Sequence, residues 1–405
     1  MMVSCAKLLR QKALFRLRGN CLIGLLLSLY LLAFSSVAVN SELIVGAEQP
    51  SLYLPLLENK RVGVVVNQSS TAFNQHLVDY LRGQSINVTA IYSPEHGFRG
   101  DKGAGEKIAS ETDATSGLPV HSLYGKTRKP NAKMLADVDV LVFDIQDVGV
   151  RFYTYISTLH YVMEAAADFG KSVVVLDRPN PNIMHVDGPI LELEYQSFVG
   201  MHPIPILHGM TVAELAQMIK GEAWIEKGEE LALTVIPVAN YDRNTFYSLP
   251  IKPSPNLPND IAIQLYPSLC LFEPTQVSIG RGTDFPFQVI GHDIVDLGSF
   301  TFTPRSMPNS APSPKLQDRA AQGIDLRNSE IKGVDLSFLF KVHQQFKLAG
   351  KTLITSTSFF DKLAGTDAVR LALESGENFH QVKAQWEEPL KHFKVQRKPY
   401  LLYAN

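Results

Sequence analysis

The sequence predicts a doubly wound α/β domain followed by a smaller α+β domain. One observation is a series of apolar, β-branched runs of strand length at residues 61–67, 86–92, 138–145, 171–177 and 231–238. Near-continuous Val, Ile and Leu is typical of strands buried on both faces, as in a parallel sheet. A second observation is that segments with helical spacing lie between these runs, and this alternation indicates a doubly wound sheet.

Three helices can be placed among the predicted strands. Residues 74–84 and 154–170 carry apolar side chains at helical spacing, and the second segment ends in a glycine that suits a helix C-terminus. Thr211 and Glu214 form the Thr-x-x-Glu pattern of a capping box, in which each side chain bonds a backbone N–H at the start of a helix. The sequence therefore predicts a third helix that opens at Thr211.

The composition changes after about residue 245. Residues 248–260 read SLPIKPSPNLPND, and this richness in Pro and Asn marks a domain boundary or an ordered loop that crosses one. Beyond it the chain mixes helices with short strands, and residues 303–315 have the composition of an exposed loop. We predict an N-terminal domain of residues 39–250 and a C-terminal α+β domain of residues 251–405.

The first 38 residues differ from the rest of the chain. Five basic residues and no acidic residue precede an apolar stretch at residues 21–34, and Ser36-Val37-Ala38 resembles a signal-peptidase site. This pattern is typical of a secretory signal peptide cleaved near Ala38, with an uncleaved membrane anchor as the alternative. We therefore expect a periplasmic or secreted protein with no stable membrane span after cleavage.

Composition limits the possible partners. The chain of 405 residues is 45% hydrophobic and 19% charged, which excludes a disordered or fibrous protein. Loss of the five basic residues near the N-terminus takes the formal net charge from −2 to −7, so we expect no nucleic-acid partner. Cys270 is then the only cysteine, which leaves no intrachain disulfide and no cysteine-based zinc cluster.

Polar side chains follow four of the predicted strands. In an open parallel sheet, ligands bind beyond the carboxyl ends of the strands, where the loops converge. Any one of these residues could cap a helix or form a turn, but four strands that deliver polar groups to one edge indicate a ligand site. The residues are Asn67, Gln68, Ser69, Glu95, His96, Asp144, Gln146, Asp147, Arg151, Asp177, Arg178, Asn180 and Asn182.

We expect no nucleotide cofactor at this edge. A dinucleotide site needs Gly-x-Gly-x-x-Gly after the first strand, but residues 67–73 read NQSSTAF and contain no glycine. The glycines of residues 100–106, GDKGAGE, lack the Lys-Ser/Thr ending of a phosphate-binding loop and are better interpreted as a flexible active-site loop. A metal-dependent hydrolase would use Glu95, His96, Asp144, Asp147 and His208. Because no spaced pair such as His-Glu-x-x-His is present, we expect no metal.

Glu95 suits the acid of a glycosidase. Such an enzyme needs a carboxylic acid that protonates the leaving oxygen and a second group that acts as base, nucleophile or charge stabiliser. Glu95 lies on a strand-end loop beside apolar Tyr92 and Phe98, and an apolar setting favours a protonated carboxyl group. The second catalytic group stays open among Asp144, Asp147, Glu106 and Tyr153.

Six ordered blocks carry a resemblance to a known family. They read SPEHGFRGDKGAGE, FDIQDVGVRFYTYISTL, LDRPNPN, HGMTVAELA, PSPNLP and FEPTQVSIGRGTDFPFQVIG. Together they resemble the NamZ-type exo-β-N-acetylmuramidases, and the resemblance covers residues 50–405. It implies a Rossmann-like N-terminal domain, a smaller C-terminal domain and a cleft between them. The implied reaction is release of N-acetylmuramic acid from the non-reducing end of peptidoglycan fragments.

The resemblance also implies roles for individual residues. The glutamate of the family's Glu-His-Gly-x-Arg-Gly block is its proposed catalytic residue and corresponds to Glu95, with His96 and Arg99 matching the same block. On the far side of the cleft the resemblance implies Glu273, Thr275 and Thr283. The expected partners are peptidoglycan-derived saccharides or muropeptides.

A guanidinium group is the cation best suited to bind the lactyl carboxylate of N-acetylmuramic acid, because its planar N–H donors match the two carboxylate oxygens. Arg99, Arg151 and Arg281 are the candidates, although Arg281 in GRGTD could instead belong to a tight turn. Tyr153 and Tyr155 could stack on a sugar or belong to the core, and PSPNLP could be a cleft wall or a stiff linker. Further candidate substrate-binding residues are Asn67, His96, Gln146 and Asp147. A metal-dependent hydrolase and a non-catalytic muropeptide-binding protein are the alternatives to a glycosidase.

Overall fold

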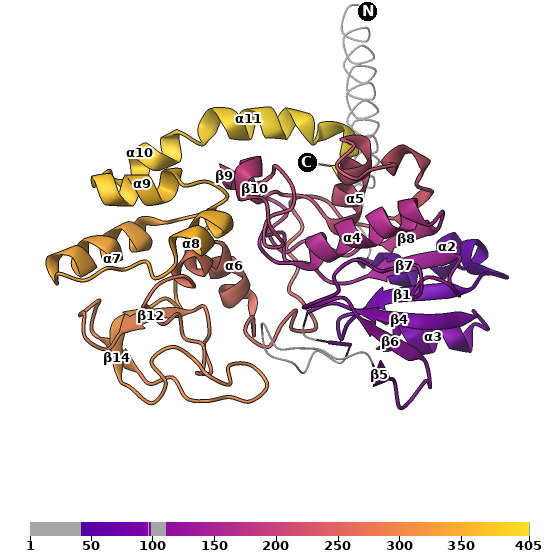
Figure 1. Ribbon diagram of the computed structural model, residues 1–405, viewed down its shortest axis with the longest axis horizontal. Coiled ribbons are helices and arrows are strands. Elements are labelled where there is room, and N and C mark those ends of the chain that lie inside the picture. Colours follow the sequence, from indigo (N-terminus) through magenta and orange to yellow (C-terminus); the bar gives the residue numbers. More distant parts are fainter. Residues whose placement is uncertain (1–41, 96, 99–110, 405) are drawn as a thin grey trace, which may run out of the picture. The chain divides into compact units, whose positions relative to one another are not determined.

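Seven strands form the main sheet of the N-terminal region (Figure 1). This computed structural model of the protein describes residues 42–95, 97–98 and 111–404. Six strands are parallel, in the order β11-β8-β7-β1-β4-β6, and β5 pairs antiparallel with β6 at the edge, so the predicted parallel sheet is confirmed. The bounds are β1 Val62–Val66, β4 Val88–Ser93, β5 Glu111–Thr112, β6 Pro119–Ser122, β7 Val140–Asp144, β8 Ser172–Leu176 and β11 Leu233–Ile236.

Strand β1 lies where the winding of the sheet reverses. Val62 pairs with Val88 of β4 on one side and with Val140 of β7 on the other, and all residues of β1 are buried. The chain first runs outward through β4 and β6 and then returns to β7, β8 and β11. The loops after β1, β4 and β7 therefore converge at one edge, which is where doubly wound sheets bind ligands.

Helices cover both faces of this sheet. Val64 of β1 packs in one hydrophobic cluster with α2 and α3, whereas its neighbour Val65 packs in another with α4 and α5. The alternation of side chains along a strand explains this division. The predicted capping box is present, because the Thr211 side chain accepts from Glu214 N at 3.3 Å and the Glu214 carboxylate accepts from Thr211 N at 3.0 Å. The helices are α2 Pro50–Leu57, α3 Leu77–Gly83, α4 Tyr155–Asp168 and α5 Val212–Gly221.

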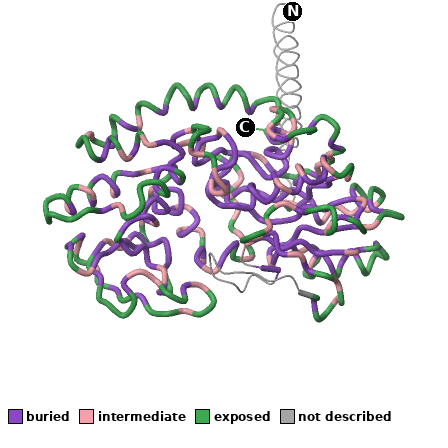
Figure 2. The backbone as a smooth tube through the Cα atoms, viewed as in Figure 1, coloured by how far each residue is buried: buried purple, intermediate pink, exposed green. Residues whose placement is uncertain are grey.

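The C-terminal region mixes helices with a small antiparallel sheet, as predicted. Its three strands lie in the order β12-β14-β13. Figure 2 shows the strands of the main sheet largely buried and helix α11 largely exposed. The strands are β12 Val289–His292, β13 Phe300–Phe302 and β14 Ala321–Asp325, and the helices are α6 Asp260–Leu269, α7 Ser337–Leu348, α8 Thr357–Ala364, α9 Ala368–Ser375, α10 Phe379–Ala384 and α11 Glu387–Gln396. Two short hairpins complete the fold, β2 Thr71–Ala72 with β3 Gln75–His76 and β9 Asp187–Ile190 with β10 Pro205–Leu207.

The last residues of the chain return to the N-terminal region. The hydroxyl of Tyr403 donates to a carboxylate oxygen of Asp177, 226 residues earlier, and accepts from the backbone N–H of Val238 at 2.9 Å. The other oxygen of Asp177 accepts from the N–H of Ala213, in the first turn of α5, at 3.0 Å. The predicted division at residue 250 stays a prediction.

A buried arginine joins the N-terminal region to α8. Arg151 follows β7 and is fully buried. Its Nη1 donates to the carbonyls of Pro189 and Ile204, both at 2.8 Å, and its Nη2 donates to those of Leu363 at 3.0 Å and Ala364 at 2.6 Å. We call this set of contacts the Arg151 clamp. It fixes α8 to the β9–β10 hairpin.

The predicted signal peptide, residues 1–38, lies outside the described residues, as does the predicted active-site loop of residues 100–106. Within residues 42–95, 97–98 and 111–404, no helix has both the length and the apolar character that crossing a membrane requires.

Gly365, which ends α8, should be sensitive to any side chain because of the Arg151 clamp. Its φ is +80°, and a Cβ would lie 2.5 Å from Nη2 of Arg151. Gly376 ends α9 with φ +82° but has open space around it, so it is a matched control. We expect Gly376→Ala to lower the free energy of unfolding by about 1 kcal/mol through its backbone conformation alone. Gly365→Ala should lower it by about 1 to 3 kcal/mol more, because the side chain overpacks the clamp. Equal losses in urea unfolding would contradict this.

Candidate active site

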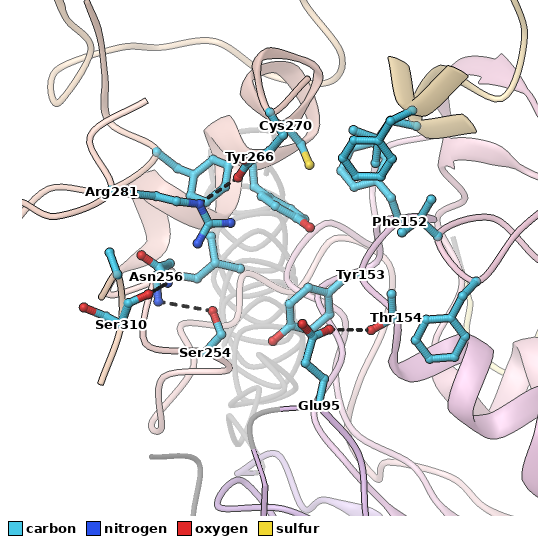
Figure 3. Close-up of a pocket in the computed structure, with 18 of the residues that line it drawn as sticks. Glu95, Phe152, Tyr153, Thr154, Ser254, Asn256, Tyr266, Cys270, Arg281 and Ser310 are labelled. Atoms are coloured by element: carbon cyan, nitrogen blue, oxygen red, sulfur yellow. Dashed lines mark hydrogen bonds and ion pairs between the residues drawn. The ribbon is translucent and has the colours of Figure 1, made fainter. Parts of the chain in front are cut away.

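A cleft of about 860 Å³ is lined by residues of both regions (Figure 3). Strand-end loops of the N-terminal region form one wall, and the C-terminal region with α8 forms the other. The first wall consists of Glu95, Tyr124, Arg128, Phe152, Tyr153, Thr154, Ser197, Phe198 and Val199. The second includes Ser254, Asn256, Leu257, Tyr266, Cys270, Glu273, Arg281, Phe287, residues 310–315, Phe359, Lys362 and Leu363.

Glu95 follows β4 and is held at the cleft by Thr154. The Thr154 hydroxyl donates to Glu95 Oε2 at 3.0 Å. Thr154 occupies the N-cap position of α4, yet its side chain makes no capping hydrogen bond there. The hydroxyl that would ordinarily stabilise the start of the helix thus orients the carboxyl group of Glu95 instead.

The tyrosines after Phe152 hold the PSPNLP segment in place. The hydroxyls of Tyr153 and Tyr155 donate to the carbonyl of Pro253 at 2.8 and 3.3 Å, and the Gln68 side chain donates to the same carbonyl at 3.1 Å. Burial raises the pKa of Tyr153 well above its ordinary value, so this phenol is neutral near pH 7. The anchored segment brings Ser254 into the cleft, opposite Glu95 and Tyr153 in Figure 3.

An ion cluster faces the cleft from the C-terminal region. Arg281 Nε donates to Glu273 Oε1 at 2.7 Å, and Lys315 Nζ donates to the Glu273 carbonyl at 2.7 Å. Burial alone would raise the pKa of the Glu273 carboxyl group, but attraction to Arg281 and Lys315 outweighs it and the pKa is lowered. Glu273 is therefore ionised near neutral pH, and the cluster carries one more positive charge than negative.

Several of the predicted strand-end residues lie outside the cleft lining and hold the loops together. Asp144 forms a buried ion pair with Arg178, at 2.5 and 2.9 Å. Asn67 accepts from the backbone and side chain of Ser69 at 2.9 and 2.5 Å. The Gln146 side chain donates to the carbonyls of Asp147 at 2.8 Å and Pro179 at 2.7 Å. These contacts make the edge rigid.

Asp147 is buried and lies outside the cleft lining. One of its oxygens accepts from Gly149 N at 2.6 Å, and the other, Oδ1, has no hydrogen-bond partner among the described residues. Burial raises the pKa of Asp147 to about 7, against the opposing effect of backbone N–H groups.

Of the remaining predicted site residues, three make hydrogen bonds that stabilise the fold and three lie outside the described residues. Arg151 makes the Arg151 clamp, and burial lowers its pKa to about 9. The Thr283 hydroxyl donates to the Gly280 carbonyl at 2.6 Å and shapes the turn next to Arg281. Thr275 likewise donates to Phe272, within its own chain segment. His96, Arg99 and Glu106 lie outside the described residues.

His208 does not approach the acidic residues proposed with it for a metal site. It is buried, its Nδ1 accepts from Met210 N at 3.3 Å, and burial together with the positive charges of Arg397 and Arg151 lowers its pKa to about 3. In the part of the chain that the structure describes, no three His, Cys, Asp or Glu side chains gather as metal ligands would.

Both regions match models of one protein family. Residues 62–261 match the N-terminal part of the exo-β-N-acetylmuramidase NamZ, and residues 264–403 match its C-terminal part. The chain belongs to the NamZ exo-β-N-acetylmuramidase family. This confirms the resemblance carried by the six sequence blocks, and with it the prediction that the protein belongs to a family of glycoside hydrolases.

Similar proteins cover nearly the whole chain. The peptidoglycan β-N-acetylmuramidase NamZ of Bacillus subtilis (strain 168) is 39% identical over 375 residues, which is 87% of this chain and 89% of that protein. Two crystal structures of DUF1343 family proteins from Bacteroides fragilis are also similar. One is 44% identical with a TM-score of 0.81 and covers 90% of this chain and 100% of its own; the other is 30% identical with a TM-score of 0.77 and covers 89% and 99%.

This NamZ-family cleft contains residues that sequence reasoning did not select. Tyr124 and Arg128 lie on the loop after β6, a strand that the apolar runs did not reveal. Phe198 and Lys362 come from segments with no recognisable motif. A search for short strands after residue 111 could have found the first two, because the loop after β6 opens at the same edge as the loop after β4.

The buried Asp147 should make stability depend on pH. Its pKa is about 7 in the folded protein against an ordinary value of 3.8, so the folded state holds this proton more tightly than the unfolded chain. Its contribution to stability is therefore full below about pH 4 and is lost as the pH rises through about 7. We expect Asp147→Asn, which carries no charge, to melt at a higher temperature than the wild type at about pH 8, with a smaller difference at about pH 5. Asp137→Asn is the control, because the Asp137 side chain is 87% exposed. A difference for Asp147→Asn that is the same at both pH values would contradict this.

Proposed function

We propose that this protein is an exo-acting glycoside hydrolase that releases N-acetylmuramic acid from the non-reducing end of peptidoglycan fragments, with Glu95 as general acid and base. The observation that carries the proposal is the carboxyl group of Glu95, which lines the cleft and is oriented by Thr154. Membership of the NamZ family and the named activity of the Bacillus subtilis relative support it.

In this mechanism Glu95 first gives its proton to the glycosidic oxygen, so that the leaving sugar departs as an alcohol. Glu95 then takes a proton from the water that attacks the anomeric carbon or a covalent intermediate. Of the described residues that line the cleft, Glu95 and Glu273 are the acidic ones. Glu273 joins Tyr153 as a candidate for the second catalytic group, because Arg281 and Lys315 lower its pKa and keep it ionised.

We also propose that Arg281 binds the lactyl carboxylate of the terminal sugar. Glu273 accepts a hydrogen bond from Nε of Arg281 and so fixes the orientation of the guanidinium group. Because Lys315 adds a second positive charge, the cluster as a whole stays positive. A fixed, planar donor group suits a carboxylate better than a mobile ammonium does. We further propose, from the sequence of residues 1–38, that the enzyme acts in the periplasm or outside the cell.

Replacement of Glu95 tests the catalytic role. Glu95→Gln keeps the shape and the hydrogen bond to Thr154 but cannot give or take a proton, so we expect kcat to fall at least about 100-fold with the affinity for the product sugar retained. The measurement is release of N-acetylmuramic acid from a chromogenic muramide, with and without a chelator. Full activity of Glu95→Gln would refute the assignment. Sensitivity to the chelator would favour a metal-dependent hydrolase, and binding without turnover by the wild type would favour a muropeptide-binding protein.

The lactyl-binding role of Arg281 predicts a change in substrate preference. We expect Arg281→Gln to raise KM for a chromogenic N-acetylmuramide about 10- to 100-fold, the loss of a charge-assisted hydrogen-bond pair. The N-acetylglucosaminide counterpart lacks the lactyl group, and any low activity towards it should change far less. An equal effect of Arg281→Gln on both substrates would show that it acts on the fold of the cleft instead.

A further inference from the structure

Two further cations, Arg128 and Lys362, line the cleft in addition to those of the Glu273 ion cluster. Arg128 and Lys362 line the cleft from opposite walls, and both are exposed. By contrast, the side chains of Glu273 and Arg281 are only 21% and 25% exposed. Arg281 is therefore more enclosed than Arg128, so we call the part of the cleft at Arg281 its closed end and the part at Arg128 its open end. We call Tyr124, Arg128, Phe198 and Lys362 the outer cluster.

Arg128 is held in position before any ligand arrives. Its guanidinium carbon lies 4.3 Å from the centre of the Phe198 ring, and that ring stacks on Tyr161 of α4 with an interplanar angle of 15°. The next residue, Lys129, pairs with two carboxylates of α4 at 3.1 and 2.7 Å, which anchors the loop. A cation over an aromatic face on an anchored loop is restrained at little cost, because the cation–π contact is itself favourable.

Neither cation of the outer cluster forms an ion pair within the described part of the protein. Among residues 42–95, 97–98 and 111–404, no carboxylate pairs with Arg128 or with Lys362, whereas Lys129, Arg281 and Arg370 each have such a partner. The rings of Tyr124 and Phe198 lie 6.4 Å apart, and both residues line the cleft with Arg128. Positive charge next to aromatic faces suits an acidic saccharide.

We propose that the outer cluster binds a carboxylate of the glycan on the leaving-group side of the scissile bond. This rests on the proposed exo activity, in which the terminal sugar occupies the closed end and the rest of the chain extends through the open end. Because muramic acid alternates with glucosamine in peptidoglycan, the first carboxylate beyond the scissile bond is carried by the third sugar. The outer cluster thus selects oligomers of the alternating glycan over the isolated disaccharide.

The carboxylate has two possible sources. In a peptide-free glycan it is the lactyl group of the third sugar. In a glycan with peptide stems that lactyl group is an amide, and the carboxylates belong to the stem. The chemistry that the outer cluster recognises is the same in both.

The test compares substrates with and without a distal carboxylate. The purified enzyme is given the disaccharide MurNAc-GlcNAc, the tetrasaccharide of two such units, and the tetrasaccharide with a peptide stem on its third sugar. We expect the wild type to have a lower KM for the tetrasaccharide than for the disaccharide, and Arg128→Gln to reduce this advantage about 5- to 10-fold. Lys362→Gln should act in the same direction, more weakly. Lys126→Gln is the matched control, because Lys126 is exposed on the same loop and is not part of the cleft lining.

The outcomes distinguish the two sources of the carboxylate. They also distinguish failure of the outer cluster from failure of the proposed function. An effect of Arg128→Gln on the peptide-free tetrasaccharide alone assigns the lactyl carboxylate, an effect on the stem-bearing tetrasaccharide alone assigns the stem, and an effect on both shows that the outer cluster binds either carboxylate. Equal KM ratios in wild type and Arg128→Gln for both tetrasaccharides, or the same change with Lys126→Gln, would overturn the outer cluster. If the wild type releases N-acetylmuramic acid from none of the three, it is the proposed function that fails.

Discussion

The buried guanidinium of Arg151 is the interaction on which the cleft depends. A cation without a carboxylate partner is costly to bury, and here four carbonyl oxygens replace water around it. Those carbonyls belong to a hairpin and to a helix more than 150 residues apart in sequence. Since Phe152, Tyr153 and Thr154 follow directly, one side chain both joins the two walls of the cleft and sets the start of the segment that orients Glu95.

Some of the polar residues at the strand ends are buried and hold the loops in place, whereas others face the cleft. Asp144 with Arg178, and Asn67 with Ser69, satisfy one another in the interior and immobilise the loops. Groups that face the cleft are placed on this support, as Glu95 is. A catalytic group must be held to within a fraction of an ångström to be effective, and buried hydrogen-bonded neighbours are the means by which a loop achieves this.

Local pattern in the sequence was enough to predict the sheet and its ligand-binding edge, but it could not show which side chains face the cleft. The long strands and the helices after them follow from periodicity, which is a property of neighbouring residues. Strand β6 is short and includes Pro119 and His121, so it gave no apolar run and the loop that carries Arg128 was missed. The sequence predicts Asp144 and Arg151 together with Glu95 because all three lie at the ends of strands. Their inward direction depends on partners far away in the chain, such as Arg178 and the carbonyls of α8, and no local pattern contains that information.

The return of the C-terminal tail has a consequence for the order of folding. Asp177 lies near the centre of the chain, and its buried carboxylate meets its Tyr403 partner only when residues near the very end are available. The buried carboxyl group of Asp177 therefore stays without this partner until residues near Tyr403 join the fold. Contacts of such long sequence separation slow folding, because the loop they close must be ordered first. The same arrangement places Tyr403 in a hydrophobic cluster with Ile183, Val238 and Tyr241, which lie far earlier in the sequence.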